Sequence, residues 1–327
     1  MTAQIFTLLL GVAGAVLLCF GADGLVRGGA ALARLAKVPT LVIGLTVVAF
    51  GTSAPELVVS IDAALRGAGD ISIGNVVGSN ICNIALILGV SALVRPLPVN
   101  KSLFKLDLPV MAASTLLLSV WCFFAGGIGR AGGGFFFLML CAYLAKRLYD
   151  ARHDPADAAA LAAEAEEAPT MRWYTAAGLT LLSIAMLIIG AKFFVNGAVV
   201  AARLAKVSEA VIGLTVVALG TSLPELATSV AAARRGECDI AVGNVIGSNL
   251  FNVLCILGVS PLVSPIRTAG INLFDLGAMC VATGVLWAMM LTGRSISRRE
   301  GGVLLALYLV YVAKLAAFPA WGAWNWR

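Results

Sequence analysis

Two segments of this chain contain the residue types that can hold a cation. The sequence IGLTVVAFGTSAPE occupies positions 43–56, and IGLTVVALGTSLPE occupies positions 212–225. In both, a long apolar run is interrupted by Gly-Thr-Ser and a proline, and then reaches a glutamate. A carboxylate within an apolar segment of this kind is costly unless something compensates it, so Glu56 and Glu225 are the first candidates for a functional role.

The oxygens around these glutamates suggest a particular ligand. Pro55 and Pro224 lack an N–H group and leave a backbone carbonyl without its helical donor, while Gly51 relaxes the backbone nearby. The hydroxyl groups of the two segments belong to Thr52, Ser53, Thr221 and Ser222. Carboxylate, carbonyl and hydroxyl oxygens together make an all-oxygen site of the kind that hard cations such as Ca²⁺ and Na⁺ prefer. The plainer alternative is that the hydroxyls bond their own helix and the glutamates are buried for packing.

Each segment is followed, at the same spacing, by a second polar motif. GNVVGSNICN begins at Gly74, and GNVIGSNLFN begins at Gly243. The glycines permit close helix packing. In each motif a serine and an asparagine four residues apart share one helix face, so we expect them to face the site. These residues are Ser79 and Asn83 in the first motif and Ser248 and Asn252 in the second. The other asparagines, Asn75, Asn80, Asn244 and Asn249, are expected to be structural.

The composition indicates that the elements carrying these motifs are membrane helices. The chain has 327 residues, of which 60% are hydrophobic and 12% charged. This is too apolar for a soluble domain, and apolar runs of about 20 residues recur. The sequence therefore predicts an all-α polytopic membrane protein in which the net charge of +6 reflects topology and not nucleic-acid binding. Residues 1–20 contain no basic residue and are expected to be the first transmembrane helix.

The same composition argues against an enzyme. Seven cysteines are scattered without a CxxC pair, and there is a single histidine, His153. A zinc or haem centre has almost no ligands to draw on, so no resident cofactor is expected. No histidine lies near the motif serines, and no paired-aspartate motif is present, which makes an intramembrane hydrolase the least favoured class.

The chain divides into two related halves. Glu225 lies 169 residues after Glu56, and Ser248 lies 169 residues after Ser79. This constant offset indicates a duplication. We expect a first half at 1–149, a short solvated linker at 150–171 and a second half at 172–327. The expected helices are about 4–30, 40–65 (broken near Gly51), 71–93, 105–126 and 133–149, and in the second half about 209–233, 270–292 and 301–318. The repeat implies two more in the second half, one before the ARLAKV segment at 202–207 and one with the AVGNVIGSNLFN segment at 241–252.

Ten transmembrane helices follow from this division, and the odd number in each half has a consequence for symmetry. With five helices between equivalent positions, the two halves enter the membrane from opposite sides, which is the inverted repeat of many secondary transporters. Counting Lys and Arg assigns about 15 of them to the inner loops and about 8 to the outer side. Both termini are then outside and the linker is cytoplasmic. Asp62, Asp70, Asp107, Asp239 and Asp275 fall near helix ends and are expected to be solvated.

These paired motifs resemble the alpha-repeats of the cation/calcium exchanger superfamily, and the chain resembles its prokaryotic sodium/calcium exchangers. The resemblance covers 21–96 and 190–265. It implies Ca²⁺ bound by Glu56 and Glu225 with the carbonyls of Thr52 and Thr221, and Na⁺ bound by Ser53, Ser222, Ser79 and Ser248. It also implies alternating access in which the first and sixth helices slide across the core. The expected protein is a multi-pass Ca²⁺/Na⁺ antiporter of the cytoplasmic membrane that functions as a monomer.

One departure from that family leaves the coupling ion open. Asn252 stands where some sodium/calcium exchangers carry aspartate, so the site has two carboxylates and not three. A third Na⁺ would need neutral oxygens. Protons on the two glutamates would also complete an antiport cycle, so Ca²⁺/H⁺ exchange is the main alternative. Potassium co-transport stays open, and a passive cation channel is a further class, although two internal carboxylates fit occlusion better than a continuous pore.

Overall fold

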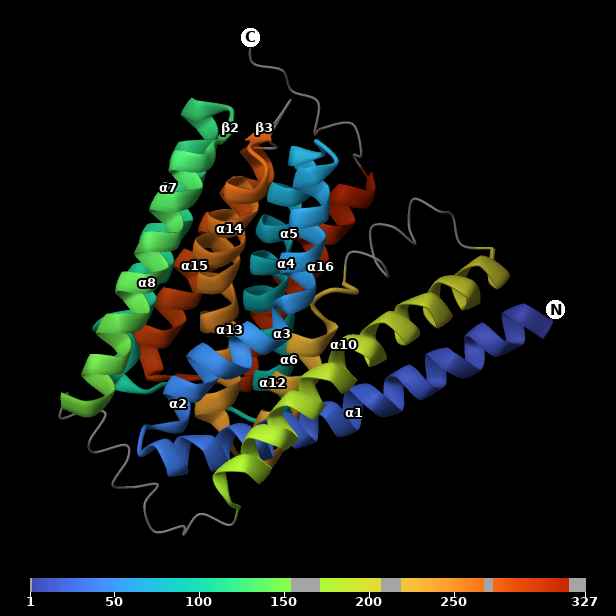
Figure 1. Cartoon of the computed structure of the whole chain (residues 1–327), viewed down its shortest axis with the longest axis horizontal. Helices are drawn as coiled ribbons and strands as arrows, with labels where there is room; N and C mark the ends of the chain where they lie inside the picture. Colours follow the sequence, from blue (N-terminus) through green and yellow to red (C-terminus); the bar gives the residue numbers. More distant parts are fainter. Residues whose placement is uncertain (1, 154–170, 207–218, 268–272, 318–327) are drawn as a thin grey trace.

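The structure is a computed structural model that describes residues 2–153, 171–206, 219–267 and 273–317 (Figure 1). Within these ranges long helices dominate, joined by short turns and four two-residue strands. Seven described helices are long and apolar enough to cross a membrane, and up to eight if one bent pair is a single span. The expected helix at about 209–233 begins outside the described residues. The chain is thus an all-helical membrane protein, and the number of ten spans stays a prediction.

Two peripheral helices, α1 (Thr2–Ala36) and α10 (Trp173–Leu204), lie side by side across the bundle (Figure 1). Small residues allow the close approach, because a Cβ on Gly11 would lie 2.9 Å from the Cα of Gly197. Only 28% of the apolar window of each helix is buried. Most of their surface is therefore available to lipid.

The first glutamate-containing segment, residues 43–56, lies in a bent helix; we call it and its repeat at 212–225 the signature motifs. This helix runs through α2 (Thr40–Ile43), the π-helical turn η1 (Gly44–Val48) and α3 (Ala49–Thr52), and continues after a 46° bend as α4 (Ala54–Leu65). The expected break near Gly51 is confirmed, because the backbone leaves the helix at Ser53, with φ −82° and ψ 5°. Gly51 lies within α3 and makes room for a neighbour, since a Cβ there would lie 2.5 Å from Cδ1 of Ile184.

The two helices that carry the asparagine-rich motifs, GNVVGSNICN and GNVIGSNLFN, form the centre of the bundle. The first comprises α5 (Gly69–Ile81), η2 (Cys82–Ile87) and α6 (Leu88–Val94). Its counterpart comprises α13 (Cys238–Leu250), η5 (Phe251–Ile256) and α14 (Leu257–Val263). Their apolar windows are 78% and 100% buried. The π-helical turns η2 and η5 lie at equivalent positions, and such widened turns often occur at functional sites.

The remaining elements surround this centre. Helix α12 (Leu223–Arg235) begins within the segment 212–225 and includes Glu225. The outer helices are α7 (Asp107–Ala125), α8 (Arg130–His153), α15 (Leu273–Gly293) and α16 (Arg298–Ala317), with a 3₁₀ turn η3 (Lys101–Phe104) before α7. Strand β1 (Leu97–Pro98) pairs with β4 (Ser295–Ile296), and β2 (Gly127–Ile128) pairs with β3 (Ile266–Arg267), both antiparallel. Each ladder therefore joins one half of the chain to the other.

Of the five aspartates expected to be solvated, Asp107 is buried, and Asp239 and Asp275 are half-buried. Asp107 is fully buried, accepts a 2.7 Å hydrogen bond from the Tyr143 hydroxyl and lies 3.5 Å from Nε of the buried Arg147. Asp275 is half-buried and accepts a 3.0 Å bond from Tyr311. The prediction failed because residues at a helix start look solvated in sequence, whereas here a neighbouring helix covers them.

Candidate cation site

The two signature glutamates occupy equivalent positions at the start of helices. Glu56 lies in the first turn of α4 and Glu225 in the first turn of α12, each one residue after a proline. The preceding serines leave the helix with nearly the same geometry, φ −82° at Ser53 and φ −87° at Ser222. The positive end of a helix dipole therefore lies beside each buried carboxylate and stabilises its charged form.

Hydrogen bonds cross between the halves at this point. The Ser53 hydroxyl donates to Oε1 of Glu225 at 2.9 Å, and the Ser222 hydroxyl donates to Oε1 of Glu56 at 3.2 Å. Ser222 also lies 3.4 Å from the Ser79 hydroxyl. All five side chains are buried. The structure thus brings these five sequence-predicted residues together. Ser53 and Ser222 each donate a hydrogen bond to the carboxylate of the opposite half.

The other carboxylate oxygens lack this support. Oε2 of Glu56 and Oε2 of Glu225 are buried and accept no hydrogen bond from the described residues. Neither glutamate forms an ion pair with a described Lys, Arg or His. Since an unsatisfied buried oxygen is expensive, two such oxygens at equivalent positions indicate that a ligand completes their coordination.

Four asparagines from the two central helices form a crossed pair of hydrogen bonds. Asn83 donates from Nδ2 to Oδ1 of Asn249 at 3.2 Å, and Asn252 donates from Nδ2 to Oδ1 of Asn80 at 2.9 Å. The Oδ1 atoms of Asn83 and Asn252 are buried and accept no hydrogen bond from the described residues. The Ser248 hydroxyl is likewise buried and unbonded there. These neutral oxygens extend the set of free acceptors begun by the two carboxylates.

The two threonines are placed unequally. Thr52 is buried and donates to Oδ1 of Asn244 at 3.1 Å. Asn244 in turn donates to the carbonyl of Glu225 at 3.4 Å and to Ser229 at 2.9 Å. Thr221, by contrast, is half-buried, and so is Asn75, the counterpart of Asn244.

The asparagines that were expected to be structural also hydrogen-bond residues of the candidate site. Asn75 donates to the carbonyl of Glu56 at 3.2 Å and to Ser60 at 3.0 Å, which matches the contacts of Asn244. Asn80 and Asn249 hold the amides of Asn252 and Asn83. A three-residue spacing places Asn80 and Asn83 near one helix face, a signal that the sequence did contain.

The chemistry of this arrangement is that of a hard-cation site. The described residues contain no group of three or more His, Cys, Asp or Glu side chains able to hold a metal. The negative charge here therefore comes from two glutamates, and the other candidate donors are hydroxyl, amide and carbonyl oxygens. Ca²⁺ and Na⁺ favour such ligands, whereas Zn²⁺ and other softer metals favour nitrogen and sulfur.

Comparison with known proteins leads to the same class. Residues 6–149 and 175–316 match the sodium/calcium exchanger protein family. The sodium/calcium exchanger MaX1 of Methanosarcina acetivorans is 35% identical over 96% of this chain and 99% of its own length. The inner membrane protein YrbG of Escherichia coli is 36% identical over 93% of this chain and 95% of its own length.

A solved structure agrees with these relatives. The sodium-calcium exchanger NCX_Mj, soaked with 2.5 mM Na⁺ and 0.1 mM Ca²⁺, superposes with a TM-score of 0.79 at 32% identity, covering 96% of this chain and 98% of that one. The family expected from the motifs is thereby confirmed. The chain belongs to the sodium/calcium exchanger family of the cation/calcium exchanger superfamily and is a membrane cation antiporter.

Proposed function

We propose that the protein expels Ca²⁺ in exchange for Na⁺, with both ions competing for one site between Glu56 and Glu225. The observation that carries this proposal is the set of buried oxygens without hydrogen-bond donors among the described residues. Both glutamates contribute one such oxygen, and Asn83, Asn252 and Ser248 contribute others. A hard cation would compensate these buried oxygens, and no described side chain donates a hydrogen bond to them.

The charge of the site makes exchange obligatory. Two ionised glutamates give a formal charge of −2, which one Ca²⁺ or two Na⁺ neutralise. An empty, doubly negative site is costly to carry through a low-dielectric region, whereas either loaded form is nearly neutral. A third Na⁺ would bind on neutral oxygens alone.

The ligands divide between the two ions by chemistry. Ca²⁺ takes the two carboxylates together with the backbone carbonyls of Thr52 and Thr221. Sodium uses the hydroxyl and amide oxygens around them, from Ser53, Ser222, Ser79, Ser248, Asn83 and Asn252. This division is supported by the serine–glutamate bonds, because a hydroxyl that donates to a carboxylate can turn its lone pairs toward a cation when one binds.

The architecture proposed for this function has ten spans in two inverted halves, 1–149 and 172–327, joined by a cytoplasmic linker at 150–171. Support comes from elements that recur at the same offset, such as η2 and η5, and from the ladders that join the halves. In this scheme α1 and α10 move across the core to expose the site alternately to each side. The protein works as a monomer, without a resident cofactor.

We place the antiporter in the cytoplasmic membrane, with both termini outside. The distribution of basic residues supports this orientation. The relative from Escherichia coli is named an inner membrane protein, which supports the location.

Uptake of radioactive Ca²⁺ into proteoliposomes tests the coupling ion. An outward Na⁺ gradient and an outward H⁺ gradient are imposed separately on the purified protein. We expect Na⁺ alone to drive uptake, and Glu56→Gln or Glu225→Gln to abolish it because each removes half of the site's charge. Uptake driven only by H⁺ would assign the protein to Ca²⁺/H⁺ exchange, and uptake with neither gradient would indicate a channel.

A further inference from the structure

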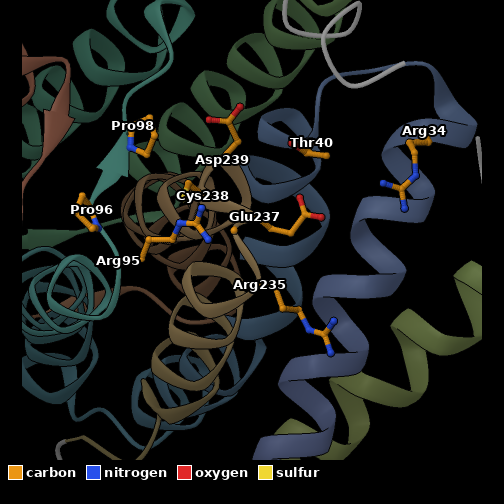
Figure 2. Close-up of a pocket in the computed structure, with 10 residues that line it drawn as sticks. Arg34, Thr40, Arg95, Pro96, Pro98, Arg235, Glu237, Cys238 and Asp239 are labelled. Atoms are coloured by element: carbon orange, nitrogen blue, oxygen red, sulfur yellow. The ribbon is translucent and has the colours of Figure 1, made fainter. Parts of the chain in front are cut away.

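An ion pair joins the peripheral helix α1 to the core. Arg235 of α12 donates from Nε to Oδ1 of Asp23 at 2.6 Å and from Nη2 to Oδ2 of the same carboxylate. Arg27, one turn along α1, lies 3.4 Å from that carboxylate. Figure 2 shows Arg235 projecting from α12 toward the helix that carries Arg34, which is α1. A two-point arginine–carboxylate pair fixes orientation as well as distance, so it sets the register of one helix on the other.

The equivalent positions in the other half cannot form this pair. The offset of 169 residues maps Asp23 onto Lys192 and Arg235 onto Arg66, so both partners become cations. Arg66 pairs instead within its own helix, with Asp62 at 2.8 Å. In α12 the residue equivalent to Asp62 is Ala231. The Asp23–Arg235 ion pair is therefore specific to one end of the molecule.

Open space lies on both sides of the pair. Arg235 lines a cavity of about 760 Å³ together with Thr40, Arg95 and the turn Gly236–Asp239 (Figure 2). It also lines a cavity of about 460 Å³ between α1 and α12, whose walls include Cys19, Asp23 and Ala231. Ala22 and Leu25 of α1 and Ala232 of α12 are buried, whereas Asp23 and Arg235 lie beside the two cavities, so the ion pair adds a directional contact at the edge of this packing.

This is also the more enclosed end of the candidate site. The turn after Arg235 leads into α13, where Asn244 and its partner Thr52 are buried. The turn after Arg66 leads into α5, where Asn75 is half-buried, as is Thr221. Arg235 shares its larger cavity with Arg95 and Pro98. Four residues after Pro98, the Ser102 hydroxyl accepts a hydrogen bond from Arg147, near the end of α8. The Arg235 end is therefore the end where the 150–171 linker begins.

We propose that Asp23 and Arg235 are positioning residues that hold α1 in one register on α12 and keep the site closed on the linker side. This inference rests on the proposed function, since the register matters to transport only if α1 moves during the cycle. Opening on the linker side requires the pair to separate. Removing it favours the state open to the linker side, whereas the Arg66–Asp62 pair within α4 has no such effect.

Cross-linking measures the register directly. Cys19 and Ala231 line the same cavity, so a protein that keeps Cys19, carries Ala231→Cys and lacks the other six cysteines reports the distance between α1 and α12. In proteoliposomes with a short bifunctional thiol reagent, we expect Asp23→Asn and Arg235→Gln to slow cross-linking by up to about fivefold, the upper value for a partly exposed ion pair. The exchange of the two charges, Asp23→Arg with Arg235→Asp, restores it. Arg66→Gln is the matched control and leaves it unchanged.

Transport by the same variants links register to function. Asp23→Asn and Arg235→Gln are expected to tighten the apparent affinity for Ca²⁺ presented on the linker side relative to the other side, and the charge exchange to reverse this. Unchanged cross-linking in both single variants, or no recovery on charge exchange, would overturn the proposal. If the single variants alter cross-linking while no form of the protein exchanges cations, the proposed function fails and the register contact stands.

Discussion

Ser53 donates a hydrogen bond to Glu225, a residue of the opposite half of the chain, and Ser222 does the same for Glu56. The two carboxylates are thus each supported from across the interface between the halves. A movement that separates the halves would withdraw this support from both glutamates at once. Occupation of the site and the packing of the two halves are therefore coupled.

Replacing these serines should weaken Na⁺ binding more than Ca²⁺ binding. Ser53→Ala and Ser222→Ala each remove a hydroxyl oxygen proposed to bind Na⁺, and we expect the apparent Na⁺ affinity to fall about tenfold, which corresponds to about 1.4 kcal/mol. Both glutamates remain to bind Ca²⁺. The measurement is the Na⁺ dependence of Ca²⁺ uptake, with Ser119→Ala as the control because that hydroxyl bonds the Thr115 carbonyl in α7. Equal losses for both ions would contradict the assigned roles.

The sequence singled out residues that the structure brings together, but it said little about how they are held. Glu56 and Glu225 stood out because carboxylates are rare in apolar helices, and the repeat made them equivalent. The crossed serine–glutamate bonds were not predictable, because spacing along one helix says nothing about which residue faces it from another. The packing of Ile184 against Gly51 was not predictable for the same reason.

Asn249 and Asn80 should orient the amides of the site. Each accepts the N–H of its partner, Asn83 or Asn252, and so turns the partner's oxygen away from this contact. Asn249→Leu and Asn80→Leu remove the acceptor at similar volume, and we expect the affinity for both ions to fall about tenfold, since about 1.4 kcal/mol corresponds to that factor. Isothermal titration with Ca²⁺ and with Na⁺ provides the measurement. Asn196→Leu, at an exposed position on α10, is the control.

Asp107 and Arg147 should matter for stability and not for ion binding. Both are buried where the start of α7 meets the end of α8, and neither hydrogen-bonds Glu56 or Glu225. Removing one partner of a buried ion pair leaves an uncompensated charge and costs about 3–5 kcal/mol. Asp107→Asn or Arg147→Met should therefore lower the thermal unfolding temperature in detergent, while Asp107→Asn combined with Arg147→Met recovers part of the loss. A loss of Ca²⁺ affinity in the folded fraction would argue against this separation of roles.

The contact between α1 and α10 offers a test with an internal control. A Cβ on Gly197 would lie 2.6 Å from the Cα of Gly11, whereas a Cβ on Gly178, in the same helix, meets nothing within 4 Å. Alanine normally favours a helix over glycine by about 0.5–1 kcal/mol, so Gly178→Ala should be neutral or slightly stabilising. In Gly197→Ala the steric cost, typically about 1–3 kcal/mol, exceeds that gain and forces the helices apart. Thermal unfolding and Ca²⁺ uptake measured on both variants should show losses for Gly197→Ala alone, and equal behaviour of the two would mean that the pair tolerates separation.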